Sequence, residues 1–170
     1  MTTASTSPTD SVLRAMTIDG SFRFIALNAS ETARGILEAQ KLTVTPDQPA
    51  SQRQAKNARI LAELVAGAVM LRQAMSPDYR FQIVLKQNGG GTITADAFPE
   101  GMTRGLLQIP EDTELTFGPD TLLTAIRAMP NDALHQGVIE TTSQDGVSQA
   151  LMTYLASSEQ VHSVISVGTV

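Results

Sequence analysis

The sequence contains no cysteine and no tryptophan, and aromatic residues make up only 4% of its 170 residues. Without cysteine there can be no disulfide, no thiolate metal site and no cysteine nucleophile within this chain. With so few aromatic side chains, the core has to be built from Leu, Ile, Val, Ala and Met. The composition therefore excludes thiol chemistry and predicts an aliphatic core.

Positive charge and long apolar runs are also scarce. The 12 Lys and Arg residues are outnumbered by 17 Asp and Glu, giving a net charge of −5, which disfavours binding to a phosphate backbone. No run approaches the ~20 apolar residues of a membrane span. Residues 1–10 lack the basic patch and apolar block of a signal peptide. We expect a cytoplasmic protein that binds neither nucleic acid nor membranes.

The residues that are present are those of a folded domain. Hydrophobic residues account for 42% of the chain and charged residues for 17%, which is typical of globular proteins. Residues 1–10 are rich in Thr and Ser and predict a flexible tail. We expect one domain over residues 11–170.

The clearest element is a long helix over residues 52–75. Its apolar residues recur at helical spacing, and between residues 60 and 71 the only charged residue is Glu63. An apolar arc this wide predicts a buried helix. Gly67 disfavours a helix, and close packing against its backbone would explain its presence. Ser76-Pro77 predicts the end of the helix.

The remaining elements are shorter. Ser30 is a candidate cap for a helix over residues 31–41, and residues 147–156 predict a second short helix with Val147, Leu151 and Leu155 inward. Alternating or β-rich patterns predict strands; these are residues 21–27, 81–86, 92–98, 102–109, 134–141 and 161–167. Residues 12–18 fit either an extended or a helical segment, and the spacing in 121–129 suits a helix.

Candidate sites for chemistry are few. The Gly-rich segment 88–92 lacks the Lys of a phosphate-binding loop and precedes a strand, so it predicts a plain hairpin turn. His135 and His162 have no carboxylate or second His at a metal-binding spacing, so a metal would need ligands from distant segments. We expect both to be partly exposed strand residues.

The carboxylates show no pairing either. Glu111, Asp112 and Glu114 lie in a predicted acidic loop. Glu63 is open to three interpretations: an ion pair with an Arg such as Arg59 or Arg80, a position on a narrow solvent-facing stripe, or a catalytic acid; we favour the ion pair. No nucleophile, base and orienting group occur together. The residues predict no catalytic, cofactor-binding or metal-binding site and no enzyme activity, and they leave substrate-binding residues unknown.

Several blocks resemble the core domain of the heat shock protein 33 family, in the same order and spacing. They are Phe22-Arg23 through Ala29-Ser30-Glu31-Thr32, the long helix 58–75, the hairpin 81–97, Arg104-Gly105, the block 135–140, and the segment 148–160 with Tyr154 and Ser158-Glu159-Gln160. The resemblance covers about residues 12–170, and Ser158-Glu159-Gln160 after Tyr154 is its most specific part.

This resemblance implies an α+β fold with two packed β-sheets and a buried central helix. It also implies that residues 121–129 form a strand paired with 134–140, against their local preference. Members of the family are ATP-independent holdase chaperones of the cytoplasm that bind unfolded proteins under stress, often as dimers. The expected partners are therefore unfolded or misfolded client proteins and a second copy of the chain, with no cofactor.

The sequence departs from the family in two respects. Family members continue with another core strand, a helical linker and a cysteine-bearing zinc domain, so we expect a C-terminally incomplete core without the redox switch. Phe24 stands where the family commonly has Gly. Two alternatives to a holdase remain: a structural or oligomerising remnant without client binding, and a small-molecule enzyme of unknown class.

Overall fold

The computed structural model describes residues 9–42, 49–110, 112–131 and 133–169. Its elements, in chain order, are β1 (Ser11–Met16), β2 (Arg23–Asn28), α1 (Ser30–Ala39), α2 (Pro49–Met75), β3 (Arg80–Gln87), β4 (Gly91–Ala97), β5 (Thr103–Gln108), β6 (Thr121–Ala128), β7 (Leu134–Glu140) and α3 (Val147–Ser158). Residues 43–48 lie outside the described residues, and α2 begins at Pro49.

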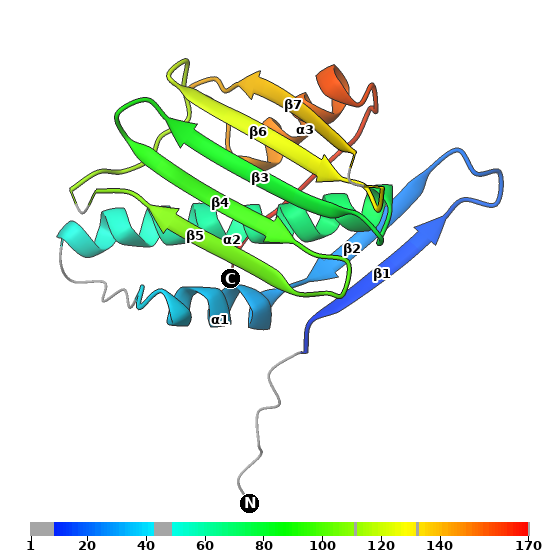
Figure 1. The fold of residues 1–170 in the computed structure, drawn as a ribbon, viewed down its shortest axis with the longest axis horizontal. Helices are drawn as coiled ribbons and strands as arrows, with labels where there is room; N and C mark the ends of the chain where they lie inside the picture. The colour runs from blue at the N-terminus through cyan, green and yellow to red at the C-terminus, as the bar shows by residue number, and fades with distance from the viewer. Residues whose placement is uncertain (1–8, 43–48, 111, 132, 170) are drawn as a thin grey trace, which may run out of the picture.

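A five-stranded antiparallel sheet in the order β5-β4-β3-β6-β7 is the larger of two sheets. The helices α2 and α3 lie behind it in Figure 1, and α1 runs alongside. We call the helix-covered side the inner face and the opposite side the outer face. β1 and β2 form a separate two-stranded hairpin that extends away from the sheet. The predicted α+β architecture with two sheets and a central helix is confirmed.

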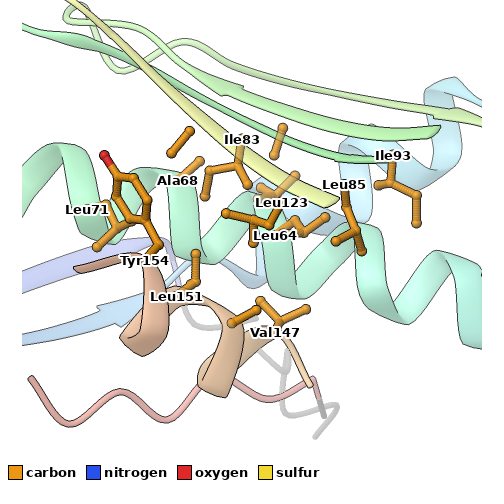
Figure 2. Close-up of a cluster of buried hydrophobic side chains, with 14 of the residues drawn as sticks. Leu64, Ala68, Leu71, Ile83, Leu85, Ile93, Leu123, Val147, Leu151 and Tyr154 are labelled. Carbon is orange, nitrogen blue, oxygen red and sulfur yellow. The ribbon is translucent and has the colours of Figure 1, made fainter. Parts of the chain in front are cut away.

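The long helix α2 is the buried spine of the domain, as its sequence predicts. Leu61, Leu64 and Val65 are completely buried in the core. Figure 2 shows Leu64 among inner side chains of the sheet such as Ile83 and Leu123. A Cβ on Gly67 would lie 2.6 Å from Leu151 Cδ1, so the glycine admits the close approach of α3. The helix ends at Met75, before Pro77, as predicted.

Helix α3 completes the inner layer. Val147, Leu151 and Leu155 point into the core as predicted, and Tyr154 is fully buried beside them. Its ring meets Phe81 of β3 edge-on, with centroids 6.4 Å apart. Burial of these side chains removes apolar area from water, which is the main term favouring the folded state.

Segments with conflicting signals adopt the extended form. Residues 121–128 are strand β6 although their spacing suits a helix, because they pair with β3 on one side and β7 on the other. The strand implied by the family resemblance is therefore confirmed. Residues 11–16 form β1, which settles the two possibilities for 12–18 in favour of an extended segment.

The strand predicted for residues 161–167 is wrong. No strand is assigned there; the segment lies along α3, where the Val161 amide donates to the Leu155 carbonyl (3.0 Å) and the Val167 amide to Ser148 Oγ (2.9 Å). Ile165 is nevertheless buried. The alternating apolar pattern reflects packing against α3. An extended segment can bury alternate side chains against a helix without pairing in a sheet.

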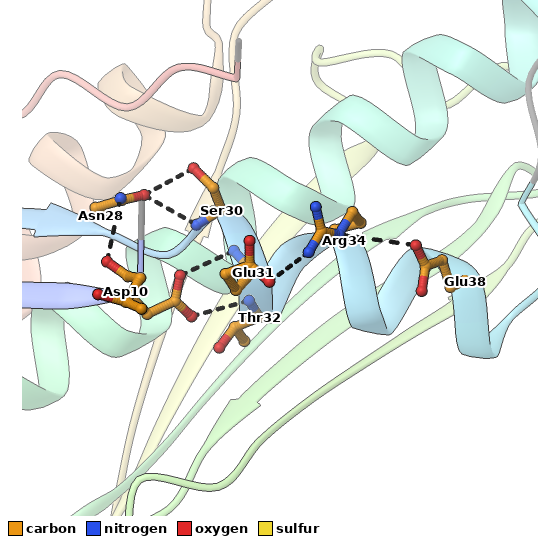
Figure 3. Close-up of polar contacts among 8 residues, drawn as sticks. Asp10, Asn28, Ser30, Glu31, Thr32, Arg34 and Glu38 are labelled. Atoms are coloured by element: carbon orange, nitrogen blue, oxygen red, sulfur yellow. Dashed lines mark hydrogen bonds and ion pairs between the residues drawn. The ribbon is translucent and has the colours of Figure 1, made fainter. Parts of the chain in front are cut away.

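The predicted cap at Ser30 is also wrong. The helix begins at Ser30 itself, whose hydroxyl donates to Asn28 Oδ1 (2.7 Å), and the carboxylate of Asp10 accepts from the amides of Glu31 (2.8 Å) and Thr32 (2.9 Å) (Figure 3). Desolvation alone would raise the pKa of Asp10, but these hydrogen bonds and the Arg34 charge outweigh it and lower the pKa below its ordinary value. A residue of the predicted tail therefore caps α1.

Candidate functional site

The predicted chemical groups are mostly structural where the structure describes them. Glu63 forms the expected ion pair with Arg59 (3.2 Å). In the acidic loop, Glu114 pairs with Lys56 (2.8 Å), while Glu111 lies outside the described residues. The segment 88–92 is the predicted hairpin turn: Gly89 and Gly91 take positive φ angles of 72° and 109°, which side-chain-bearing residues rarely adopt.

His162 is exposed, whereas His135 lies beside a carboxylate from a distant segment. Glu159, mostly buried immediately after α3, accepts hydrogen bonds from Arg127 Nη1 (3.1 Å) and from the Tyr154 hydroxyl (2.6 Å). His135 Nε2 approaches the same carboxylate at 3.4 Å. Burial and the bond to Glu159 raise the pKa of Tyr154, so its hydroxyl remains a donor.

This cluster ties the end of α3 to β6 and β7, because the Glu159 carboxylate contacts Arg127 of β6 and His135 of β7. Local spacing missed it, since its members are far apart in the sequence. The Ser158-Glu159-Gln160 block was the available signal, because it is the most specific part of the family resemblance.

A zinc site does not fit the residues present. Zinc sites of structural type need Cys or His ligands, and the chain has no Cys. Among the described residues, no group of three His, Asp or Glu side chains is placed to hold a metal ion.

Most of the exposed large apolar side chains lie on two surfaces. The first is the hairpin arm, residues 11–28, which projects beyond the sheet in Figure 1. Leu13 and Phe24 lie on its outward face, each more than half exposed, while Arg23 on the other face donates to the Ala74 carbonyl of α2 (2.8 Å). Met16, Ile18 and Phe22 add exposed apolar area toward the tip.

The second surface is the outer face of the five-stranded sheet, which no helix covers in the described part of the chain (Figure 1). The pairing register aligns one uncharged row across all its strands: Leu106, Thr94, Val84, Thr124 and Val138. Leu106 and Val138 are about half exposed at its two ends. Leu122 and Leu134 add exposed apolar side chains on the same face.

Charged residues border this row at one end of the sheet. Asp96 is buried beneath Arg80, which holds it with two hydrogen bonds of 2.9 and 2.7 Å. This bidentate pairing raises the pKa of Arg80. Arg104 approaches Asp96 at 3.7 Å, and both guanidinium groups lie over the ring of Phe98, at 4.8 Å for Arg80 and 4.6 Å for Arg104.

Comparison with models of known protein families identifies the family of this chain. The family model described as Hsp33 protein matches residues 10–170. The chain belongs to the heat shock protein 33 family. A search of curated proteins finds no match. The crystal structure of the 33 kDa chaperonin (heat shock protein 33 homolog) of Thermotoga maritima is similar in fold, with a TM-score of 0.65 at 16% identity.

That structural match covers 86% of this chain and 50% of the Thermotoga chain, so the chain spans about half the length of that protein. Family membership places the chain among chaperones and confirms the family resemblance seen in the sequence. In the described residues, no helix is long and apolar enough to cross a membrane.

Proposed function

We propose that this chain is an ATP-independent holdase core that binds non-native polypeptide segments on the outer face of its five-stranded sheet. The observation that carries the proposal is the uncharged row from Leu106 to Val138, exposed at both ends on a face that α2 and α3 leave open. Monomeric proteins rarely expose large contiguous apolar patches without a binding role.

The composition of the central row suits weak binding of apolar segments of varied sequence. Threonines alternate with aliphatic residues along the row, so a bound chain finds methyl groups for its apolar side chains and hydroxyls for its polar atoms. Ordering an unfolded segment costs conformational entropy, which offsets much of the apolar area buried. We therefore expect micromolar or weaker, rapidly reversible binding, which is appropriate for a chaperone that must release its clients.

The proposed activity is constitutive with respect to thiols. Because the chain contains no cysteine, peroxide has no thiol to oxidise, and methionine is the remaining redox-sensitive residue type. We expect that peroxide does not activate client binding through thiols, and that the purified chain contains no stoichiometric zinc by elemental analysis. Peroxide activation that persists after the methionines are replaced by leucine would contradict this part of the proposal.

We further propose that two copies associate through the hairpin arm. Within the described residues β1 pairs only with β2, so its other edge offers unpaired backbone groups to a second strand. The exposed Leu13 lies on this strand. Leu13→Lys places a charge at the edge and should shift analytical ultracentrifugation toward monomer. An unchanged sedimentation coefficient distribution would argue against association through β1.

The test of client binding compares two double variants. Leu106→Ser/Val138→Ser removes both exposed ends of the row, whereas Val161→Ser/Val164→Ser removes exposed apolar side chains from the C-terminal segment. The measurement is light scattering of a heat-denatured client protein in the presence of each variant. We expect the first to lose most of the suppression of aggregation and the second to match the parent chain.

The outcomes separate the alternatives. Equal loss in both double variants, or in neither, would reject the outer face as the client site. If the parent chain does not suppress aggregation at all but still self-associates, the oligomerising role is favoured over the holdase.

A further inference from the structure

We propose that the outer sheet face selects client segments in which an acidic residue lies next to an apolar stretch, and that Arg104 reads the acidic residue. This inference rests on the proposed client-binding function and specifies the chemistry of the preferred client.

The length of the row sets the length of the segment. Neighbouring strands lie about 4.8 Å apart, so a row crossing β5 to β7 spans roughly 19 Å, which matches about six residues of extended chain. The row itself carries no charge. An uncharged segment of about six residues therefore fits the row.

Charged residues occupy the rows on either side. One neighbouring row is Arg104, Asp96, Gln82, Ile126 and Gln136, and the other is Gln108, Thr92, Lys86, Leu122 and Glu140. Successive side chains on one face of a strand are about 7 Å apart, within reach of a side chain on a segment bound along the central row. The cations Arg104 and Lys86 lie on β5 and β3, whereas Glu140 lies on β7.

Arg104 has donors to offer because its acidic neighbour is held mainly by another residue. Asp96 is bound by Arg80 through two hydrogen bonds, and Arg104 stays 3.7 Å from it with 71% of its side chain exposed. The Phe98 ring beneath the guanidinium limits its motion without using its N–H groups. A guanidinium held in this way can form two parallel hydrogen bonds with a carboxylate.

The local charge differs from that of the whole chain. The protein has a net charge of −5, yet on this face Arg80, Lys86 and Arg104 outnumber Asp96 and Glu140. Because Glu140 repels a carboxylate at the β7 end, an acidic residue is favoured at the β5 end of the row. Charge complementarity therefore predicts both a preference and a direction for the bound segment.

The experiment uses three labelled peptides with one six-residue core of Val, Leu and Thr, ended by two Asp, two Ser or two Lys. Fluorescence anisotropy gives each Kd for the 170-residue chain at low and at high salt. We expect the Asp peptide to bind about two- to fivefold more tightly than the Ser peptide at low salt, as exposed ion pairs allow, and the Lys peptide more weakly. The preference should diminish at high salt.

Variants locate the preference. Arg104→Gln should bring the Asp and Ser peptides to equal affinity, whereas Arg104→Lys should retain a preference for Asp. Arg34→Gln is the matched control, because Arg34 is exposed on α1 and pairs with Glu31 there. A common thermal midpoint for the variants would show that each is folded.

Two results would overturn the inference while the proposed function stands: equal binding of all three peptides by the parent chain, or an Asp preference that survives Arg104→Gln. Failure of every peptide to bind would instead overturn the proposed function, and this inference with it.

Discussion

The two faces of the five-stranded sheet are made by alternate residues of the same strands, yet they have opposite roles. On β3, Ile83 is completely buried beneath α2, and the next residue, Val84, lies on the outer face between Thr94 and Thr124. The inner face is specified by packing against two helices. The outer face has no such partner in the described residues, so its composition is free to serve binding.

The difference shows where stability and function can be separated in this fold. Substitutions on the inner face create cavities or overlaps in a close-packed core, which lowers the free energy of unfolding. If the outer face is the client site as proposed, substitutions there change client binding rather than stability. The following predictions test that separation, from the largest expected change in stability to the smallest.

Leu64→Ala should produce the largest loss. Leu64 is completely buried in the core between α2 and the sheet, and truncation leaves a cavity, so we expect a decrease of roughly 2–5 kcal/mol in the free energy of unfolding. Urea denaturation followed by circular dichroism measures it. Leu106→Ala, the same truncation on the outer face, should cost far less. Equal losses at the two positions would break the comparison.

Gly137→Ala should be next. An added Cβ would lie 2.7 Å from Tyr154 Cε2 and 2.6 Å from Ser158 Oγ, and the buried aromatic ring has little room to move. Overpacking of this kind costs about 1–3 kcal/mol. Gln136→Ala, one residue earlier on the outer face, is the control and should change stability by about 0.5 kcal/mol or less. An unchanged free energy of unfolding for Gly137→Ala would mean that α3 packs loosely against β7.

Asp10→Asn tests how much the cap of α1 contributes to the free energy of unfolding. Loss of the carboxylate should cost about 0.5–1 kcal/mol, in the lower part of the range for helix caps. Because the folded pKa of Asp10 is lowered, its contribution is present above the ordinary pKa of 3.8 and is lost as pH falls through the folded pKa. The parent and variant should therefore converge in stability at acid pH; a constant difference would show that the charge is irrelevant.

The outer-face double variant Leu106→Ser/Val138→Ser should change stability no more than Asp10→Asn does. Both side chains are about half exposed, so we expect a change in the free energy of unfolding of about 1 kcal/mol or less, since each surface substitution contributes about 0.5. Its unfolding midpoint should stay close to that of the parent while suppression of client aggregation falls. A large drop in the unfolding midpoint would mean that the outer face also contributes substantially to the stability of the fold.

The inner face could largely be predicted from sequence, because burial leaves a periodic signal. The wide apolar arc of α2, the glycine at position 67 and the inward residues of α3 all follow from spacing and size. Strand β6 could not be predicted from local preference, because two flanking strands decide its conformation. Residues 161–167 show the reverse case: their alternating apolar pattern predicts a strand, but the segment lies along helix α3 instead.

The candidate site was harder to predict for a physical reason. The row from Leu106 to Val138 takes one residue from each of five strands, so it exists only once their registers are set. The same holds for Arg104, Asp96 and Arg80, which lie on three different strands, and for Glu159 with Arg127 and His135. Nothing in local spacing marks such cross-strand sets.

The cap that Asp10 provides for α1 also acts as a check on strand alignment. Asp10 immediately precedes β1, and the amides that it binds follow β2 by only a few residues, so the hairpin and the helix cap close together. A slip of one residue between β1 and β2 would move the carboxylate by about 3.3 Å and turn every side chain of the slipped strand to the opposite face. Only the native register brings the Asp10 carboxylate to the first amides of α1. The cap of α1 therefore forms only when β1 and β2 are paired correctly.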